Sequence, residues 1–383
     1  MARVKLEDVC ERGSSNLKQS DVVDKDGDYP IYGASGYIGN VDFYHQEQPY
    51  VAVVKDGAGI GRTTLHPAKS SVIGTMQYLL PKGNVLPEYL CYVVKYMHLE
   101  KYFTGATIPH IYFKDYKNEE FNLDSLDRQK EIVSTLNKIE KVIESRTKEL
   151  ELLDELIRAR FVELFGNPLD GTAKYPIHQV GEVANSVDPQ PSHRTPPVEE
   201  GGIPYVSIKD CDYKTGKIDF EGARKVSLKV LEEHMNRYIL HDGDFVVGKI
   251  GTIGNPVFVP VRNDYTLSAN VVLIQPNSEL VSPYFLKYSF ESDFVERQFA
   301  EAKNSTSQAA FGIQKVRTVE VMNPDLDVQR EFEIFVKQVD KSKFDIHKFL
   351  YCTSNNTQSI IKPRPNTKES GKTRGGKLYA DEF

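Results

Sequence analysis

Two short polar segments are rich in side chains that could form specific hydrogen bonds. They lie about 200 residues apart, and each follows a stretch predicted to be helical. Their hydroxyl, amide, imidazole and backbone N–H groups suit phosphate oxygens and the edges of nucleic-acid bases. A plain solvent-exposed connection accounts for them equally well. The candidate residues are Thr104, Thr107 and His110 in the first segment, and Asn304, Thr306 and Gln308 in the second.

Four cations next to glycine-rich or strand-end loops could contact phosphate groups. Lys55 and Arg62 flank the glycine-rich stretch 57–61, and Lys209 and Lys249 lie near loops of the second half. An ordinary solvated surface cation is at least as good an interpretation of each. The loop glycines are more simply explained as turn residues with positive φ than as ligand contacts; they are Gly57, Gly59, Gly61, Gly251 and Gly254.

No residue pattern predicts a catalytic centre or a metal site. Residues 57–61 hold the first two glycines of a dinucleotide fingerprint, but Arg62 follows, and Pro67 comes too soon for a crossover helix. The nine histidines form no HExxH motif, and the four cysteines form no CxxC pair. We therefore expect no catalytic residue, no metal and no cofactor bound by this chain.

The composition is that of an ordinary globular protein. The 383 residues are 40% hydrophobic and 27% charged, with a formal net charge of −6. That balance argues against a uniformly basic surface but permits a local basic face. No stretch approaches the ~18–20 apolar residues of a membrane helix, and the N-terminus has no apolar signal region. With four dispersed cysteines, these features predict a cytoplasmic location.

An internal repeat organises the chain and suggests a duplication. The segment Leu126–Glu131 shares four of six residues with Leu326–Glu331, at an offset of 200. Upstream, Val53–Gly61 shares four of nine residues with Val246–Gly254, at an offset of 193. Both halves therefore run in one order, with a mixed domain, a glycine loop and a Leu-Asp-x-Gln start signal before a long helix.

A long helix is predicted over residues 126–165. Asp124 or Ser125 can cap its start, and Gly166 and Pro168 supply a stop signal. Apolar residues spaced alternately by four and three form a narrow stripe, here called the seam, which is typical of a coiled coil. Forty residues span about 60 Å, which suits a spacer. The apolar seam residues are Ile132, Leu136, Ile139, Ile143, Leu150, Leu153, Ile157 and Leu164.

A second helix with a matching seam follows from residue 324. We expect it to end near Leu350, because the next six residues are poor helix formers. The matching seams suggest an antiparallel pair within the chain; alternatively, each helix packs on its own domain. The short second helix would leave Leu153, Ile157 and Leu164 without partners. The apolar seam residues of this helix include Phe332, Val336, Val339 and Ile346.

The expected fold is α+β, a pseudo-symmetric repeat of two mixed α/β domains separated by long coiled-coil spacer helices. The first domain covers residues 1–123 and the central helix 124–167. The second domain covers 168–323 and the short second helix 324–351. Residues 352–383 lack apolar periodicity and are expected to form a disordered tail.

The repeat, the glycine loops and the spacer helices together resemble the specificity subunit of type I restriction-modification systems. The resemblance runs from about Val4 to about Phe344, and Phe165-Gly166-Asn167-Pro168 closes the first helix as in that family. It implies two target-recognition domains for the halves of a split double-stranded DNA sequence, and a non-catalytic role. It also implies partners: methyltransferase subunits that use S-adenosylmethionine, and a restriction/motor subunit that uses ATP and Mg.

Three other interpretations stay open at this point, and one of them is an enzyme with an unrecognised site. A coiled-coil scaffold that binds only proteins would also have seam helices and no catalytic motif. A silent or truncated allele of a specificity subunit, without full activity, would explain the short second helix.

Overall fold

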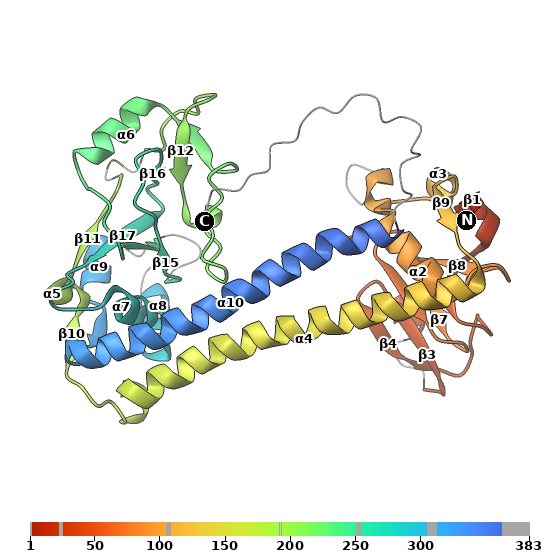
Figure 1. Ribbon diagram of the computed structural model, residues 1–383, viewed down its shortest axis with the longest axis horizontal. Coiled ribbons are helices and arrows are strands. Elements are labelled where there is room, and N and C mark those ends of the chain that lie inside the picture. Colours follow the sequence, from red (N-terminus) through yellow and green to blue (C-terminus); the bar gives the residue numbers. More distant parts are fainter. Residues whose placement is uncertain are drawn as a thin grey trace. The chain divides into compact units, whose positions relative to one another are not determined.

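The computed structural model describes residues 2–22, 26–104, 109–190, 192, 194–249, 254–304 and 312–361. The chain divides into two compact units (Figure 1). Unit 1 consists of Met1–Thr147 with His347–Phe383, and unit 2 of Lys148–Ile346. Both dividing points fall inside the long helices, so each of these helices contributes residues to both units.

Unit 1 is built on three small β-sheets. The largest is antiparallel and has the strand order β2-β8-β5-β6. A second sheet has the order β4-β3-β7, with β3 and β7 parallel, and β1 pairs with β9. The strands are β1 Ala2–Lys5, β2 Cys10–Ser14, β3 Tyr29–Gly33, β4 Gly36–Val41, β5 Tyr50–Val54, β6 Thr63–His66, β7 Ser71–Val72, β8 Met76–Pro81 and β9 Glu120–Leu123. The helices are α1 Leu6–Val9, α2 Pro87–Tyr96 and α3 Phe113–Tyr116, with 3₁₀ turns at Gln19–Asp21 and Leu99–Tyr102.

Strand β5 is central because its five residues are all apolar or aromatic and all buried. Val51 and Val53 pack on one face of the sheet in a cluster with α2. Tyr50, Ala52 and Val54 pack on the opposite face. This alternation is the two-residue period of a strand, and an unbroken apolar run suits a strand covered on both sides. Helix α2 starts with a proline at its first position, where the missing N–H costs nothing.

Unit 2 repeats the sheet topology of unit 1. Its sheets have the orders β11-β17-β14-β15 and β13-β12-β16, with β12 and β16 parallel, and β10 pairs with β18. The strands are β10 Ile177–Gln179, β11 Ala184–Val187, β12 Ile203–Val206, β13 Arg224–Val226, β14 Phe245–Gly248, β15 Val257–Phe258, β16 Thr266–Leu267, β17 Val271–Pro276 and β18 Glu320–Met322. The helices are α5 Val180–Val183, α6 Leu228–Met235, α7 Pro283–Phe290, α8 Asp293–Asn304 and α9 Ile313–Arg317, with 3₁₀ turns at Pro168–Asp170 and Ile208–Asp210. The predicted duplication is therefore present in the strand order.

The strand register corrects the sequence alignment of the two halves by one residue. Val54 pairs with Met76, and Gly248 pairs with Val271 at the same place in the equivalent sheet. Lys55 and Lys249 are the next residues, and their amides donate to the equivalent carbonyls of Thr75 and Asn270. The true offset at this strand is therefore 194 rather than 193, and the two lysines occupy the same position.

The long helix α4 has the predicted bounds, Leu126–Phe165. Gly166 follows with φ +78°, the left-handed conformation of a glycine that ends a helix. The prediction of a short second helix is wrong. Helix α10 runs from Leu326 to Ile361, 36 residues, and continues through the poor helix formers after Leu350. The predicted tail 352–383 thus begins inside this helix, and residues 362–383 lie outside the described part of the chain.

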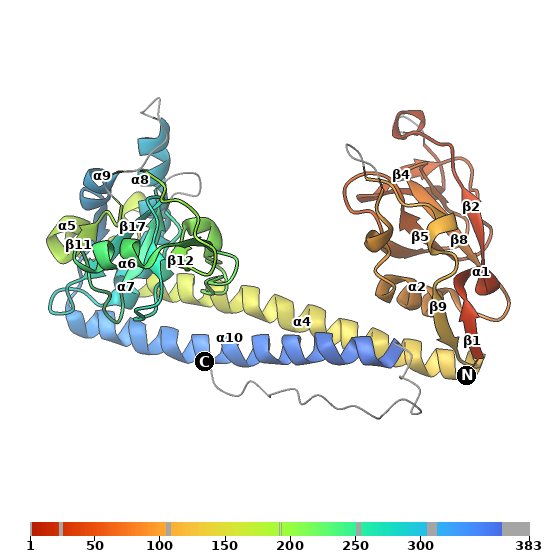
Figure 2. The same ribbon diagram turned by 90° about the horizontal axis from the view of Figure 1, so that it is seen from above.

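Inside unit 2 the end of α4 and the start of α10 are antiparallel neighbours (Figures 1 and 2). Lys343 pairs with Asp154 at 2.6 Å, and Arg160 pairs with Glu331. Ile157 is only 1% exposed, and it shares one core with Phe332, Val336 and Val339 of α10 and with residues of the sheet domain.

The expectation that the C-terminal seam of α4 lacks partners is therefore also wrong. Leu153 and Leu164 pack against the same core as Ile157. In an antiparallel pair the end of one helix meets the start of the other, so the length of α10 does not decide whether these residues are covered. In unit 1, Ile132 and Leu136 pack in the domain core, whereas Ile139 and Ile143 are half-buried. Both predicted modes of seam packing, on a helix and on a domain, thus occur.

Candidate nucleic-acid interface

The repeated Leu-Asp-x-Gln signal places a fully buried glutamine at the start of each long helix. Gln129 accepts a hydrogen bond from the Leu86 amide (2.8 Å), just before α2, and donates to the carbonyls of Asn84 and Asp124. The Gln129 side chain thus links the starts of α2 and α4, and its oxygen accepts from one of the free N–H groups at the start of α2.

Gln329 repeats this arrangement in unit 2. It accepts from the Ser282 amide (2.7 Å), just before α7, and donates to the carbonyl of Pro324. The two glutamines therefore help to fix the position of each domain relative to the start of its long helix. The sequence repeat contained this signal, but the role of the glutamine was not predicted.

In unit 1, two predicted site residues, Lys55 and His110, contact Asp56, and a third, Thr104, pairs with His110. Lys55 Nζ lies 2.6 Å from one Asp56 carboxylate oxygen, and His110 Nδ1 lies 2.7 Å from the other. The backbones of Thr104 and His110 exchange two hydrogen bonds. Burial alone would raise the pKa of Asp56, but hydrogen bonds and charges from Lys55 and His110 outweigh it and hold this pKa below its usual value. The cluster is therefore internally neutralised, and Asp56 itself was missed by sequence reasoning.

Arg62 lies apart from this cluster and is exposed. Its guanidinium has no ion pair or hydrogen bond within the part of the chain that the structure describes. It lines a pocket between the glycine loop and the β3–β4 turn. The glycines at 57, 59 and 61 all have positive φ, as predicted for turn residues.

In unit 2 the equivalent lysine is buried. Lys249 is 5% exposed, and its ammonium lies 2.7 Å from Asp188. Asp188 balances the charge of the buried Lys249 ammonium, so this charge does not lie at the surface. Lys209 is exposed in the turn Ile208–Asp210. Asp188 was not predicted, because it is distant from Lys249 in the sequence.

The second polar segment falls mostly outside the described residues. Asn304 is the last residue of α8, and Thr306 and Gln308 lie beyond the described part, as do Thr107 and Gly251. The assignment of these residues to a DNA contact stays a prediction.

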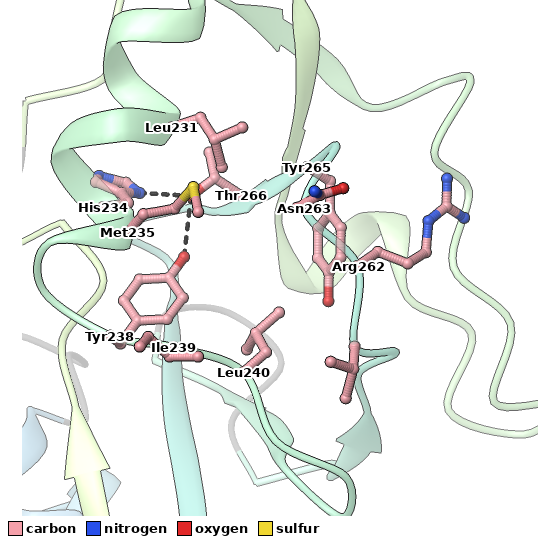
Figure 3. A pocket seen from close by; sticks show the side chains of 11 residues that line it. Leu231, His234, Met235, Tyr238, Ile239, Leu240, Arg262, Asn263, Tyr265 and Thr266 are labelled. Carbon is pink, nitrogen blue, oxygen red and sulfur yellow. Dashed lines mark hydrogen bonds between the residues drawn. The ribbon is translucent and has the colours of Figure 1, made fainter.

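A pocket in unit 2 was not predicted from sequence (Figure 3). It is a cavity of about 430 Å³ between α6 and the loop that joins β15 to β16. His234 bonds to the Thr266 hydroxyl (2.6 Å) and to Gln190, and Tyr238 bonds to the same hydroxyl (2.9 Å). Burial lowers the pKa of His234, so it is neutral at pH 7, and its ring is already engaged. The network shapes an apolar recess, and among the described residues that line it no acid or base is left free.

Comparison with known proteins decides what these domains are. The family model described as "Type I restriction modification DNA specificity domain" matches residues 1–155 and again residues 174–351. The chain belongs to this family. It is a DNA-recognition subunit of a type I restriction-modification complex, and specificity subunits are non-catalytic members of that complex. The resemblance seen in the sequence is therefore confirmed.

Relatives agree with this assignment. The specificity subunit of the type I restriction enzyme MjaVIII of Methanocaldococcus jannaschii is 22% identical over 308 residues, 76% of this chain and 72% of that protein. The S subunit from M. genitalium has a similar fold, with a TM-score of 0.56 and 14% identity over 94% of each chain. A chain from a type I system studied for complex assembly and conformational transition gives a TM-score of 0.52 at 12% identity, over 94% of this chain and 96% of that one.

Among the described residues of this specificity subunit, no helix is both long and apolar enough to span a bilayer.

Proposed function

We propose that this specificity subunit recognises a bipartite DNA target, with unit 1 contacting one half-site and unit 2 the other. The observation that carries the proposal is the duplicated sheet topology. Two copies of one scaffold support two equivalent DNA contacts. The loops on the two copies differ. Unit 2 adds helix α6 between β13 and β14, where unit 1 has only the connection from β4 to β5. Differing loops on one scaffold suit two different DNA sequences.

The long helices are proposed to dock methyltransferase subunits, which then recruit the restriction/motor subunit. Outside the seam, α4 and α10 expose large apolar side chains that a lone helix pair would not need. An exposed apolar stripe of this kind supports a protein interface. In unit 2 the stripe on α4 consists of Leu152 and Leu156, which are one helical turn apart. Other exposed large apolar residues of the two helices in this unit are Val162 of α4 and Ile334 and Phe344 of α10. Leu152 and Leu156 lie on a different face of α4 from the stripe predicted at Leu153, Ile157 and Leu164.

The chemistry of the complex would belong to the partners. The methyltransferase would use S-adenosylmethionine, and the restriction subunit ATP and Mg. The described part of this chain contributes no cluster of three or more metal-ligating side chains.

Methylation mapping of a complete complex tests the proposal. The full chain would be co-expressed with the methyltransferase encoded beside it, in a host without adenine methylation. We expect one methylated motif made of two specified halves separated by a gap of fixed length and free sequence. A single uninterrupted motif would contradict the bipartite assignment, and methylation without any motif would contradict sequence recognition itself.

A further inference from the structure

A pocket in unit 1 presents polar side chains that lack partners. It is a cavity of about 430 Å³ between the turn joining β3 to β4 and the glycine loop after β5. Within the described parts of the chain, none of its polar side chains forms a hydrogen bond or an ion pair. They are Gln19, Ser35, Arg62 and Thr75.

The Thr75 hydroxyl is the most informative of the four. Its oxygen is buried and has no hydrogen-bond partner among the described residues. Buried hydroxyls are nearly always hydrogen-bonded, so this unpaired hydroxyl beside the pocket is a donor that a bound group satisfies if the Thr75 side chain rotates toward it. The position of Thr75 is fixed, because its carbonyl accepts the amides of Lys55 (3.0 Å) and Asp56 (3.3 Å).

Arg62 gives the pocket its charge. A Cβ atom on Gly59 would lie 2.1 Å from Arg62 Nη2, so the glycine leaves the space that the guanidinium occupies. Nearby Lys55 is already neutralised by Asp56 at 2.6 Å. Among the predicted phosphate contacts, Arg62 is thus the cation that both lacks a described partner and lines a pocket.

We propose that this pocket binds a phosphate group of the DNA backbone, with the Arg62 guanidinium opposite its charge and the hydroxyls of Thr75 and Ser35 donating to its oxygens. The inference rests on the proposed function and adds an anchoring contact to it. Phosphate oxygens accept hydrogen bonds, and the pocket offers a cation and unpaired hydroxyl donors to them. Such a contact fixes the position of unit 1 on the duplex and carries no sequence information.

DNA-binding measurements on the complete complex with its methyltransferase subunits test this. Arg62→Ala should weaken binding to cognate and unrelated DNA by the same factor, about tenfold near 0.1 M salt. It should also reduce the slope of log K against log salt by about 0.9, the value for one phosphate contact. The methylated motif should not change. Arg3→Ala is the matched control, because Arg3 is an exposed arginine of unit 1 that already pairs with Glu120 at 2.6 Å.

Thr75→Val gives a second, independent readout. The change removes the unpaired hydroxyl but keeps the shape, so the free protein should be as stable as the wild type or more so, while DNA binding weakens. Unchanged affinity and salt slope in Arg62→Ala would overturn the inference, as would relaxed specificity at a single base position, which would make Arg62 a base contact. A wild-type complex that binds no DNA would instead refute the proposed function.

Discussion

Single buried polar residues connect the recognition domains to the helices that carry them. Gln129 and Gln329 are both fully buried and both satisfy a backbone N–H at a helix start. Their equivalence is the clearest residue-level trace of the duplication. A leucine at either position would bury similar volume but would leave backbone groups unpaired.

Gln329→Leu is expected to destabilise unit 2 by about 2–4 kcal/mol, because the Ser282 amide and the Pro324 carbonyl lose their partner. Chemical denaturation would measure the loss in the free energy of unfolding, and hydrogen exchange at α7 and β18 would locate it. Gln338→Leu is the control on the same helix, where the side chain is exposed. Equal stability of the two variants would show that the buried amide contributes nothing.

A buried histidine predicts a pH dependence for unit 1. Burial lowers the pKa of His66 to about 4, whereas an unfolded chain has a value near 6.5. The unfolded state therefore takes up the proton first as the pH falls. The stability of unit 1 should be full above about pH 6.5 and fall by about 1.4 kcal/mol per pH unit between 6.5 and 4.

Hydrogen exchange of the β5 and β8 amides between pH 7 and pH 5, corrected for intrinsic rates, would report this loss. His66→Phe keeps an aromatic ring next to Tyr50 and should flatten the profile. Burial also lowers the pKa of His45, so a smaller slope of the same sign should remain. An identical slope in variant and wild type would contradict the assignment to His66.

At the scale of elements, the first long helix was predictable and the end of the second was not. Helix α4 has a regular seam and a glycine-proline stop, and both act locally. For α10, the run from Tyr351 to Asn356 suggested an end, but these residues each cost less than about 0.7 kcal/mol in a helix. The stronger signal is Pro363, which disfavours helix at the preceding residue and lies two residues after Ile361.

The candidate site was predictable only in part. The sequence singled out Lys55, Arg62 and Lys249 as cations next to loops. It did not predict that Asp56 and Asp188 neutralise two of them. Asp56 is next to Lys55 in the sequence and was overlooked, whereas only the fold brings Asp188 to Lys249. Ion pairs between distant residues follow from tertiary packing, which short sequence patterns do not encode.

The exposed apolar stripe of α4 gives a prediction at this scale. Leu152→Asp with Leu156→Asp should weaken methyltransferase docking at least tenfold, because charged groups would be buried in an apolar interface. Stability of the free chain should fall by no more than about 1 kcal/mol, because each of the two exposed changes costs up to about 0.5 kcal/mol. Native mass spectrometry of the complex would count bound subunits, with Glu151→Ala as the exposed control on the same helix. Full docking of the double variant would remove this face from the proposal.

For the whole molecule, the boundaries of the compact units differ from those of the sheet domains. The core of unit 2 draws on three parts of the chain: Ile157, Phe161 and Phe165 from α4, the sheet domain with Phe285, and Phe332 from α10. Phe161 and Phe285 stack with ring centres 5.7 Å apart. The predicted domain 168–323 thus supplies only part of the residues in the core of unit 2.

Two chimaeras with a relative test this. Exchanging residues 148–346 should give a stable chain that changes one half of the methylated motif. Exchanging only 168–323 should lose several kcal/mol, because foreign side chains would meet Phe161 and Phe332 in a packed core. Thermal unfolding compares stability, and methylation mapping compares specificity. Equal stability of both chimaeras, or a change in both half-sites, would contradict the modular organisation.

The hydrophobic core of each unit includes residues of the long helices, and this affects how such genes acquire new specificities. A crossover at the visible border between sheet domain and helix would separate aromatic residues that must match. A crossover inside α4 near Thr147 and another inside α10 near Ile346 would transfer a complete unit. Recombination among related genes should therefore leave its joints within the two helices. The segment exchanged between genes is then a sheet domain together with the helix ends that complete its core.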